Sequence, residues 1–89
     1  MKTLAGTLLL ACGLAHGAPI AEVIDGDVRV ELHADAGPCQ HGALWAVFYR
    51  AQARISGCWR LVGADVFIAW LDADASRIPA RMFREPKPL

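Results

Sequence analysis

This chain of 89 residues lacks an excess of charge of either sign, with nine lysine and arginine residues against nine aspartate and glutamate residues. Proteins that bind nucleic acid gain affinity by neutralising phosphates with clustered basic side chains. Attachment to anionic lipid needs a polybasic segment, and the sequence contains none. We therefore predict neither a nucleic-acid partner nor an electrostatic attachment to membranes.

The sequence also lacks an apolar run long enough to span a membrane. The N-terminal run, residues 4–14, is shorter than the ~20 residues that a helix needs to cross the hydrocarbon core. Lys2 precedes this run, and Ala15-His16-Gly17 follows it with small residues at the −3 and −1 positions of a cleavage site. The pattern predicts a secretory signal peptide over residues 1–17 and export to the periplasm or the medium.

A second processing route starts from Cys12. The segment "LLAC", residues 9–12, resembles the lipobox of bacterial lipoproteins, in which the cysteine is lipidated and becomes the first residue. In the other interpretation, Cys12 is an ordinary apolar residue that is removed with the leader. The two routes predict different first residues for the mature chain, Cys12 and Ala18.

Cysteine is scarce, and only Cys39 and Cys58 remain once the leader is removed. Disulfides form and persist in the oxidising compartments that an exported chain reaches. A domain of ~70 residues buries barely enough apolar surface to offset its conformational entropy, so it usually needs a staple. We predict a Cys39–Cys58 disulfide; a metal site and two free thiols remain as alternatives.

Local motifs for metal binding and catalysis are absent from the sequence. It has no CxxC or HxxxH pair, so a metal site would have to combine the two cysteines with His33 and His41. The only serines, Ser56 and Ser76, do not lie in a G-x-S-x-G context. We predict no metal, no small-molecule cofactor and no catalytic residue, and keep a small hydrolase as the enzymatic alternative.

The segment "DADAS", residues 72–76, begins like a calcium-binding loop. An EF-hand loop requires glycine at its sixth position and glutamate at its twelfth, where this chain has Arg77 and Phe83. We therefore interpret Asp72 and Asp74 as parts of a solvated turn between two strands.

Alternation of apolar and polar residues predicts an all-β fold. In residues 28–33 apolar side chains point to one face and polar side chains to the other, as in a half-buried strand. Further strands are predicted at residues 20–24, 43–50, 54–61, 65–71 and 76–79, with Gly57 marking a bulge or a close approach. Residues 43–50 are ambiguous, because their aromatics favour a strand and their alanines a helix.

These elements predict one small domain over residues 18–83, an antiparallel meander or partly closed barrel of four to five strands. Pro79 can begin a helical turn that ends near Phe83. Residues 84–89 form a polar, proline-rich segment that we predict to be a mobile tail.

The second half of the chain resembles a loose group of small exported proteobacterial proteins, many of them associated with phages or prophages. The resemblance covers about residues 39–83. It rests on Gly57-Cys58-Trp59, Val66-x-Ile68-x-Trp70, Asp72-x-Asp74, Ile78-Pro79 and Phe83. Members often carry glycine where this chain has Ala73, so the turn there can differ. The resemblance implies a compact, cysteine-linked β-fold and implies no chemistry.

Two of the predicted strands are apolar on both faces. Residues 65–71 place Val66, Ile68 and Trp70 on one side and Phe67, Ala69 and Leu71 on the other, and residues 43–49 show the same pattern. We assign Trp59 and Trp70 to the core, because buried aromatics dominate small cores. The second apolar face is either hidden by the curvature of a barrel or exposed as a patch for a protein contact. The candidate patch residues are Leu44, Phe48, Phe67 and Leu71.

These features predict a small exported binding protein without enzymatic activity, which acts on a protein partner or forms a homodimer. An inhibitor of an envelope enzyme or a surface accessory protein would fit, since a small stapled domain loses little entropy on binding. A structural envelope protein anchored by lipid on Cys12 is the second hypothesis.

Overall fold

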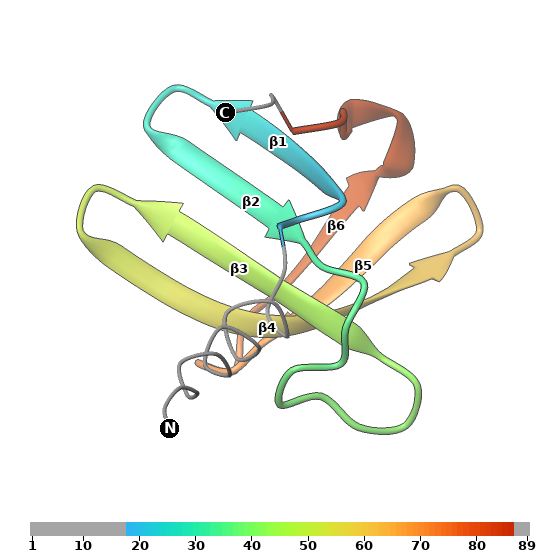
Figure 1. Cartoon of the computed structure of the whole chain (residues 1–89). Coiled ribbons are helices and arrows are strands. Elements are labelled where there is room, and N and C mark those ends of the chain that lie inside the picture. Colours follow the sequence, from blue (N-terminus) through green and yellow to red (C-terminus); the bar gives the residue numbers. More distant parts are fainter. Residues whose placement is uncertain (1–17, 87–89) are drawn as a thin grey trace, which may run out of the picture.

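The computed structural model describes residues 18–86, which form a single six-stranded antiparallel sheet with the strands in chain order (Figure 1). A short 3-10 helix, η1 (Ala80–Met82), follows the last strand. The strands are β1 (Ala21–Asp25), β2 (Val28–Leu32), β3 (Leu44–Arg50), β4 (Ala53–Val62), β5 (Asp65–Trp70) and β6 (Ala75–Pro79). The predicted signal peptide and lipobox lie outside the described residues. Within residues 18–86 no helix is both long enough and apolar enough to cross a membrane.

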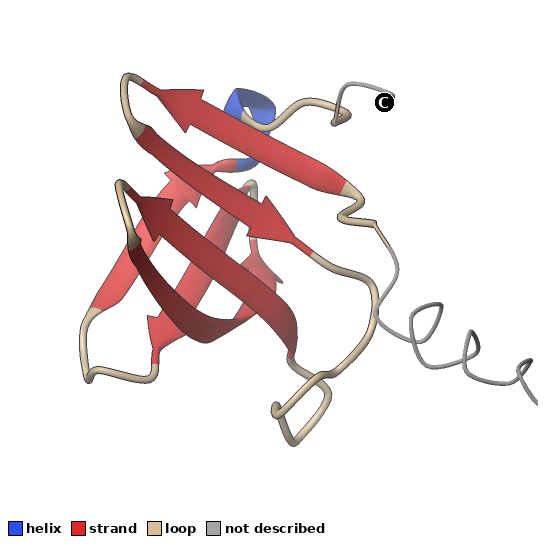
Figure 2. Cartoon of the chain, turned by 60° about the vertical axis from the view of Figure 1, so that its left-hand side comes forward, coloured by secondary structure: helices blue, strands red, loops and turns tan. Residues whose placement is uncertain are grey.

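The sheet curls into a half-barrel, which Figure 2 shows with the two ends of the meander approaching each other. The chain after η1 pairs with β1 at one isolated bridge between Glu22 and Arg84. Two backbone hydrogen bonds of 2.8 and 2.9 Å join these residues. Since a curved meander has two exposed edges, this bridge partly covers the edge of β1. The bridge therefore holds Arg84 beside the edge strand β1.

The concave face of the half-barrel is the hydrophobic core. The strand register brings the apolar positions of neighbouring strands onto this face, with Val30 opposite Phe48 and Trp59 opposite Ile68. The buried core consists of Val30, Leu32, Ala46, Val66, Ile68 and Trp70. Trp59 packs against this core and donates its indole N–H to the carbonyl of His33 at 3.1 Å. Curvature thus lets a single sheet enclose its own core without a second layer.

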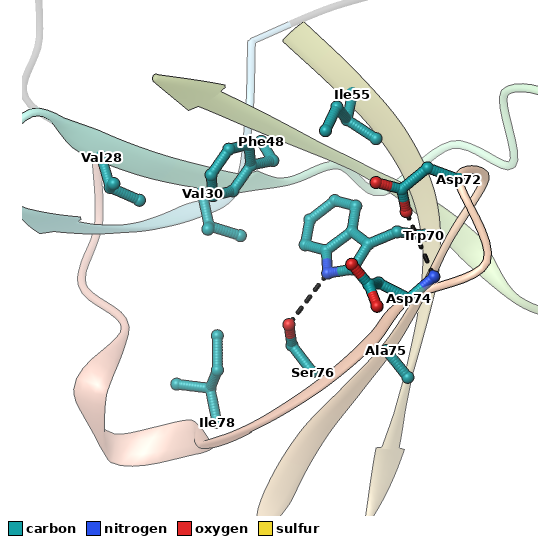
Figure 3. A pocket seen from close by; sticks show the side chains of 10 residues that line it. All are labelled: Val28, Val30, Phe48, Ile55, Trp70, Asp72, Asp74, Ala75, Ser76 and Ile78. Carbon is teal, nitrogen blue, oxygen red and sulfur yellow. Dashed lines mark hydrogen bonds between the residues drawn. The ribbon is translucent and has the colours of Figure 1, made fainter. Parts of the chain in front are cut away.

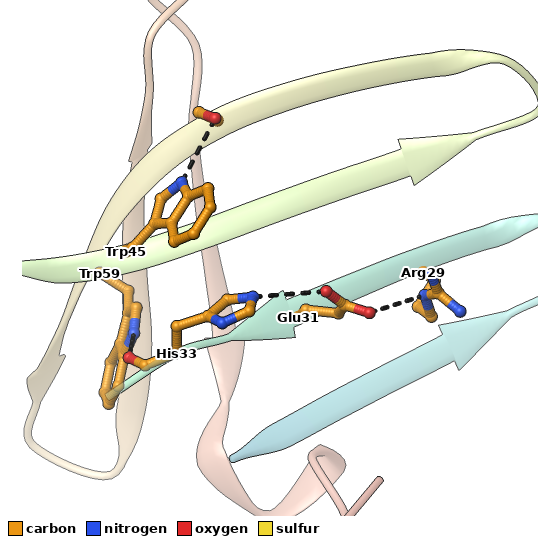
Figure 4. Close-up of polar contacts among 6 residues, drawn as sticks. Arg29, Glu31, His33, Trp45 and Trp59 are labelled. Atoms are coloured by element: carbon orange, nitrogen blue, oxygen red, sulfur yellow. Dashed lines mark hydrogen bonds and ion pairs between the residues drawn. The ribbon is translucent and has the colours of Figure 1, made fainter. Parts of the chain in front are cut away.

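The convex face is covered by its own long side chains. Val47, although it lies on this face, is fully buried, and its neighbours there include Glu31, Trp45 and Tyr49. The ring of Trp45 stacks on His33 at 4.8 Å between centroids. A row of polar contacts continues along β2, from His33 to Glu31 and from Glu31 to Arg29 (Figure 4). Large amphipathic side chains therefore shield the convex face from solvent, as a second sheet would in a β-sandwich.

The all-β prediction is confirmed, with six strands in place of four or five. The predicted end strands, residues 20–24 and 76–79, correspond to β1 and β6. The ambiguous segment, residues 43–50, forms strand β3, which hydrogen-bonds to β2 on one side and to β4 on the other. Pairing on both edges outweighs the helix propensity of its alanines, because propensity is a weak local preference.

The predicted disulfide is confirmed. Cys39 and Cys58 are bonded with their Cα atoms 5.7 Å apart, and their sequence separation is 19 residues. The bond fastens the loop between β2 and β3 to the convex face of β4, beside Trp45. It therefore joins two elements that the strand ladder does not hold together directly.

The turn between β5 and β6 keeps a glycine-like conformation without a glycine. Ala73 has a φ of 81°, in the left-handed region that side chains disfavour. We expect Ala73→Gly to raise the free energy of unfolding by about 1 kcal/mol in urea titrations, since it relieves this strain.

Ala69→Gly is the matched control for that substitution. Ala69 is exposed in the middle of β5 and has ordinary strand geometry, so glycine there should lower stability by about 0.5–1 kcal/mol. Equal losses at both positions would show that Ala73 is unstrained in solution.

Candidate functional site

An open cavity of about 530 Å³ lies at one end of the concave face. The turns between β1 and β2, β3 and β4, and β5 and β6 all lie at this end, because alternate connections of an antiparallel meander fall at the same end of the sheet (Figure 2). Apolar side chains form most of the wall, and two carboxylates lie at the rim. The lining residues are Val28, Val30, Phe48, Ile55, Trp70, Asp72, Asp74, Ala75, Ser76 and Ile78. We call this space the Trp70 cavity.

Trp70 is the central group of the cavity and is held by two neighbours. Its indole N–H donates to the hydroxyl of Ser76 at 2.9 Å. Its ring meets that of Phe48 edge to face, with centroids 5.8 Å apart (Figure 3). Edge-to-face aromatic pairs add to the stability that burial provides. Trp70 is only 9% exposed, so its indole is a fixed and largely buried part of the cavity wall.

The rim of the cavity carries Asp72 and Asp74, on the turn that follows β5. Figure 3 shows both carboxylates beside the Trp70 indole. The carboxylate of Asp72 accepts the backbone N–H of Asp74 at 3.2 Å, which fixes the turn. Within residues 18–86 no lysine or arginine forms an ion pair with either carboxylate. Both side chains are exposed, so the mouth of an apolar cavity is negatively charged.

The four candidate patch residues do not form one surface. Leu44 and Phe48 lie on the concave face, where their partners across the ladder are Trp59 and Ile55. Phe67 lies on the opposite, convex face, because the residue after it, Ile68, points into the core. The patch is therefore corrected to two separate locations. A shift of one residue reverses the face, and the sequence alone could not assign the faces of two apolar strands to each other.

Leu71 and Phe67 end in different surroundings. Leu71 lies in the turn after β5, is 65% exposed and donates its backbone N–H to the carbonyl of Ser56, so it follows Phe67 and Ala69 to the convex side and does not line the Trp70 cavity. Phe67 is half-buried in a second hollow of about 370 Å³ on the convex face, flanked by Arg60 and Arg77. Arg77 already pairs with Asp65 at 2.9 Å. Arginines therefore flank this second hollow, whereas aspartates lie at the rim of the Trp70 cavity.

The cysteines and histidines that the sequence offered as metal ligands do not form a common site. Both cysteines are in the disulfide, His41 is exposed on the loop, and His33 is buried with its Nε2 3.4 Å from Glu31. Across residues 18–86, no three histidine, cysteine, aspartate or glutamate side chains come close enough to hold a metal ion.

The sequence singled out several residues of the Trp70 cavity but did not predict that they lie around one cavity. It assigned Trp70 to the core and Asp72 and Asp74 to a solvated turn, and it placed Phe48 in a patch. The available signal was the order Trp-x-Asp-x-Asp at the end of a strand, which puts an aromatic ring and two acids at one end of a sheet. No family model, no curated protein and no solved structure matches the chain.

Proposed function

We propose that this protein is a small exported binding protein, not an enzyme, and that it holds an apolar group of a partner in the Trp70 cavity. The observation that carries the proposal is the cavity itself, an open space of about 530 Å³ with apolar walls around Trp70 and Phe48. Ligand sites are typically concave, of ~300–1,000 Å³, and lined by apolar and aromatic groups with a few polar groups at fixed positions.

The build of the domain supports a role in binding. Antiparallel pairing holds the strands that line the cavity, and the Cys39–Cys58 bond fastens a loop to β4 on the convex face. A preorganised site loses little conformational entropy when a partner binds, which favours affinity from a small surface. Export is supported by the leader pattern in residues 1–17 and agrees with the presence of a disulfide.

Substituting one wall residue tests the proposal. Ile55 is half-buried and lines the cavity from β4. We expect Ile55→Glu to weaken binding of the neutral fluorescent probe N-phenyl-1-naphthylamine about tenfold, because a carboxylate in an apolar cavity must be desolvated when the probe enters. Probe fluorescence during titration gives the affinity of each variant.

Leu61→Glu is the matched control, since Leu61 lies on the same strand, is 62% exposed and does not line the cavity. This variant should bind the probe as the parent protein does. Far-UV circular dichroism and urea midpoints establish that both variants are folded. Equal probe binding by the parent protein and a folded Ile55→Glu variant would place the probe elsewhere and contradict the proposal.

A further inference from the structure

Strand β6 is an edge of the sheet and also a wall of the Trp70 cavity. It pairs with β5 on one side, and among the strands of residues 18–86 none pairs with its other side. Its residues Ser76 and Ile78 line the cavity across from Val30 of β2 (Figure 3). An edge strand presents unpaired backbone N–H and C=O groups, which can pair with another chain. A strand added to β6 would therefore lie directly beside the cavity.

The register shows which backbone groups of β6 are unpaired. The backbone N–H of Trp70 donates to the carbonyl of Asp74 at 2.8 Å and closes the hairpin between β5 and β6. Hydrogen-bonded and non-bonded pairs alternate along an antiparallel ladder, so every second residue after Asp74 bonds to β5. The residues between them, Ala75 and Arg77, direct their N–H and C=O groups away from β5. Pro79 has no N–H and ends this row of donors.

We propose that the partner adds an extended strand to this edge of β6, antiparallel to it, and places one apolar side chain in the Trp70 cavity. This rests on the proposed function and names the form in which the partner presents its apolar group. The strand residue opposite Ser76 projects to the same face as Ser76, which is the cavity face. Its two neighbours pair with Ala75 and Arg77. Main-chain hydrogen bonds thus give affinity, and the cavity selects the side chain.

Charge at this edge favours an acidic residue of the partner opposite Arg77. The side chain of Arg77 is 58% exposed on the convex face and pairs with Asp65 at 2.9 Å. Arg60 lines the same convex hollow and forms no ion pair within residues 18–86. Two guanidinium groups therefore share one carboxylate on this part of the face. Opposite charges that face each other across two strands stabilise the pairing, so the partner strand should carry an acidic residue next to its apolar one.

Backbone methylation of a peptide separates strand addition from simple filling of the cavity. The peptide acetyl-Thr-Val-Glu-Leu-Thr-amide is designed to place its leucine opposite Ser76 and its glutamate opposite Arg77. In that pairing the glutamate N–H donates to the carbonyl of Arg77, whereas the leucine N–H points away from β6. N-methylation of the glutamate should weaken binding about tenfold, and N-methylation of the leucine should not weaken it. Titration into the ¹⁵N-labelled protein, followed at the backbone N–H signals of Ala75 and Arg77, gives each affinity.

Two side-chain changes in the peptide test the cavity and the charge. A peptide with glycine in place of leucine leaves the cavity unfilled and should bind about tenfold more weakly. A peptide with glutamine in place of glutamate loses the attraction to Arg77 and should bind about threefold more weakly.

A matched pair of variants tests the edge from the side of the protein. Arg77→Pro removes the outward N–H and leaves the hydrogen bonds to β5, because residue 77 does not donate to β5. Arg77→Ala loses the same side chain and keeps the N–H. The proline variant should bind the unmodified peptide about tenfold more weakly than the alanine variant. Circular dichroism and urea midpoints establish that both are folded, and the methylated peptides test the proposal on the parent protein if the proline variant is not.

Four results would overturn the proposal. Equal effects of the two N-methyl groups would show that the edge of β6 is not paired, and equal affinity of the leucine and glycine peptides would show that no side chain fills the cavity. A lack of saturable shifts at Ala75 and Arg77 would exclude strand addition by this peptide class. Growth of the sedimenting mass with concentration, with both signals shifting alongside, would make the added strand that of a second copy of this chain. In each case the naphthylamine titration of the Ile55→Glu variant still tests the proposed function separately.

Discussion

Replacing Cys39 and Cys58 together by alanine is expected to lower the free energy of unfolding by about 3 kcal/mol, the loop-closure entropy of a loop of this length. The bond closes a loop with a sequence separation of 19 residues and holds it on the convex face of β4. A domain of this size has little stability to spare, so the loss should approach half of the total. Urea titrations followed by far-UV circular dichroism measure it.

The loss should be concentrated at the loop between β2 and β3. Gly37 of this loop lies directly against the ring of Trp45, where an added Cβ would come within 2.7 Å of the ring. Without the bond the loop can move away from the Trp45 ring. Amide hydrogen exchange should therefore accelerate more in residues 34–43 than in β3. The parent protein treated with a reductant is the control and should unfold at the same urea concentration as the double variant. Unchanged midpoints in both samples would mean that the bond contributes nothing to stability.

Gly57→Ala is expected to lower the free energy of unfolding by about 2 kcal/mol, and Gly57→Val by more, as overpacking of a tight core does. Gly57 lies in the middle of β4, opposite Ala46 and Trp70 in the ladder. A Cβ at this position would come within 2.5 Å of Cε3 of Trp70 and 2.9 Å of the carbonyl oxygen of Ala69. Thermal and urea unfolding of both variants measure the cost.

Two further variants separate crowding from backbone effects. At Gly63 an added Cβ meets nothing within 4 Å, and its φ is +62°, so Gly63→Ala should cost about 1 kcal/mol through backbone strain alone. In a Trp70→Leu background the ring that causes the closest contact is gone, so Gly57→Ala should cost less than it does in the parent protein. An equal cost in both backgrounds would show that the Trp70 ring is not what excludes a side chain at position 57.

Gly57 also determines how closely Trp70 approaches β4. Because residue 57 has no side chain, the indole of Trp70 can lie close to this strand while it contacts Phe48 and Ser76. The sequence marked Gly57 as a bulge or a close approach, and the structure shows a close approach within regular pairing. The partner in that approach could not be read from the sequence, because it depends on the register between two strands.

The sequence by itself determined the local features of this protein. Alternating side chains identified the strands, aspartate and glycine marked the turns, and two remaining cysteines allowed one pairing. These features depend on a few consecutive residues or on simple counting, so no knowledge of the rest of the fold is needed.

Only the tertiary structure decided which apolar residues face each other. It places Leu44 and Phe48 on the face opposite to that of Phe67. It also places Trp70, Asp72 and Asp74 around one cavity. Strands that are apolar on both faces give no local signal for the inner side. The choice follows from the register of all six strands together and from the curvature that hides one face, which are properties of the whole sheet.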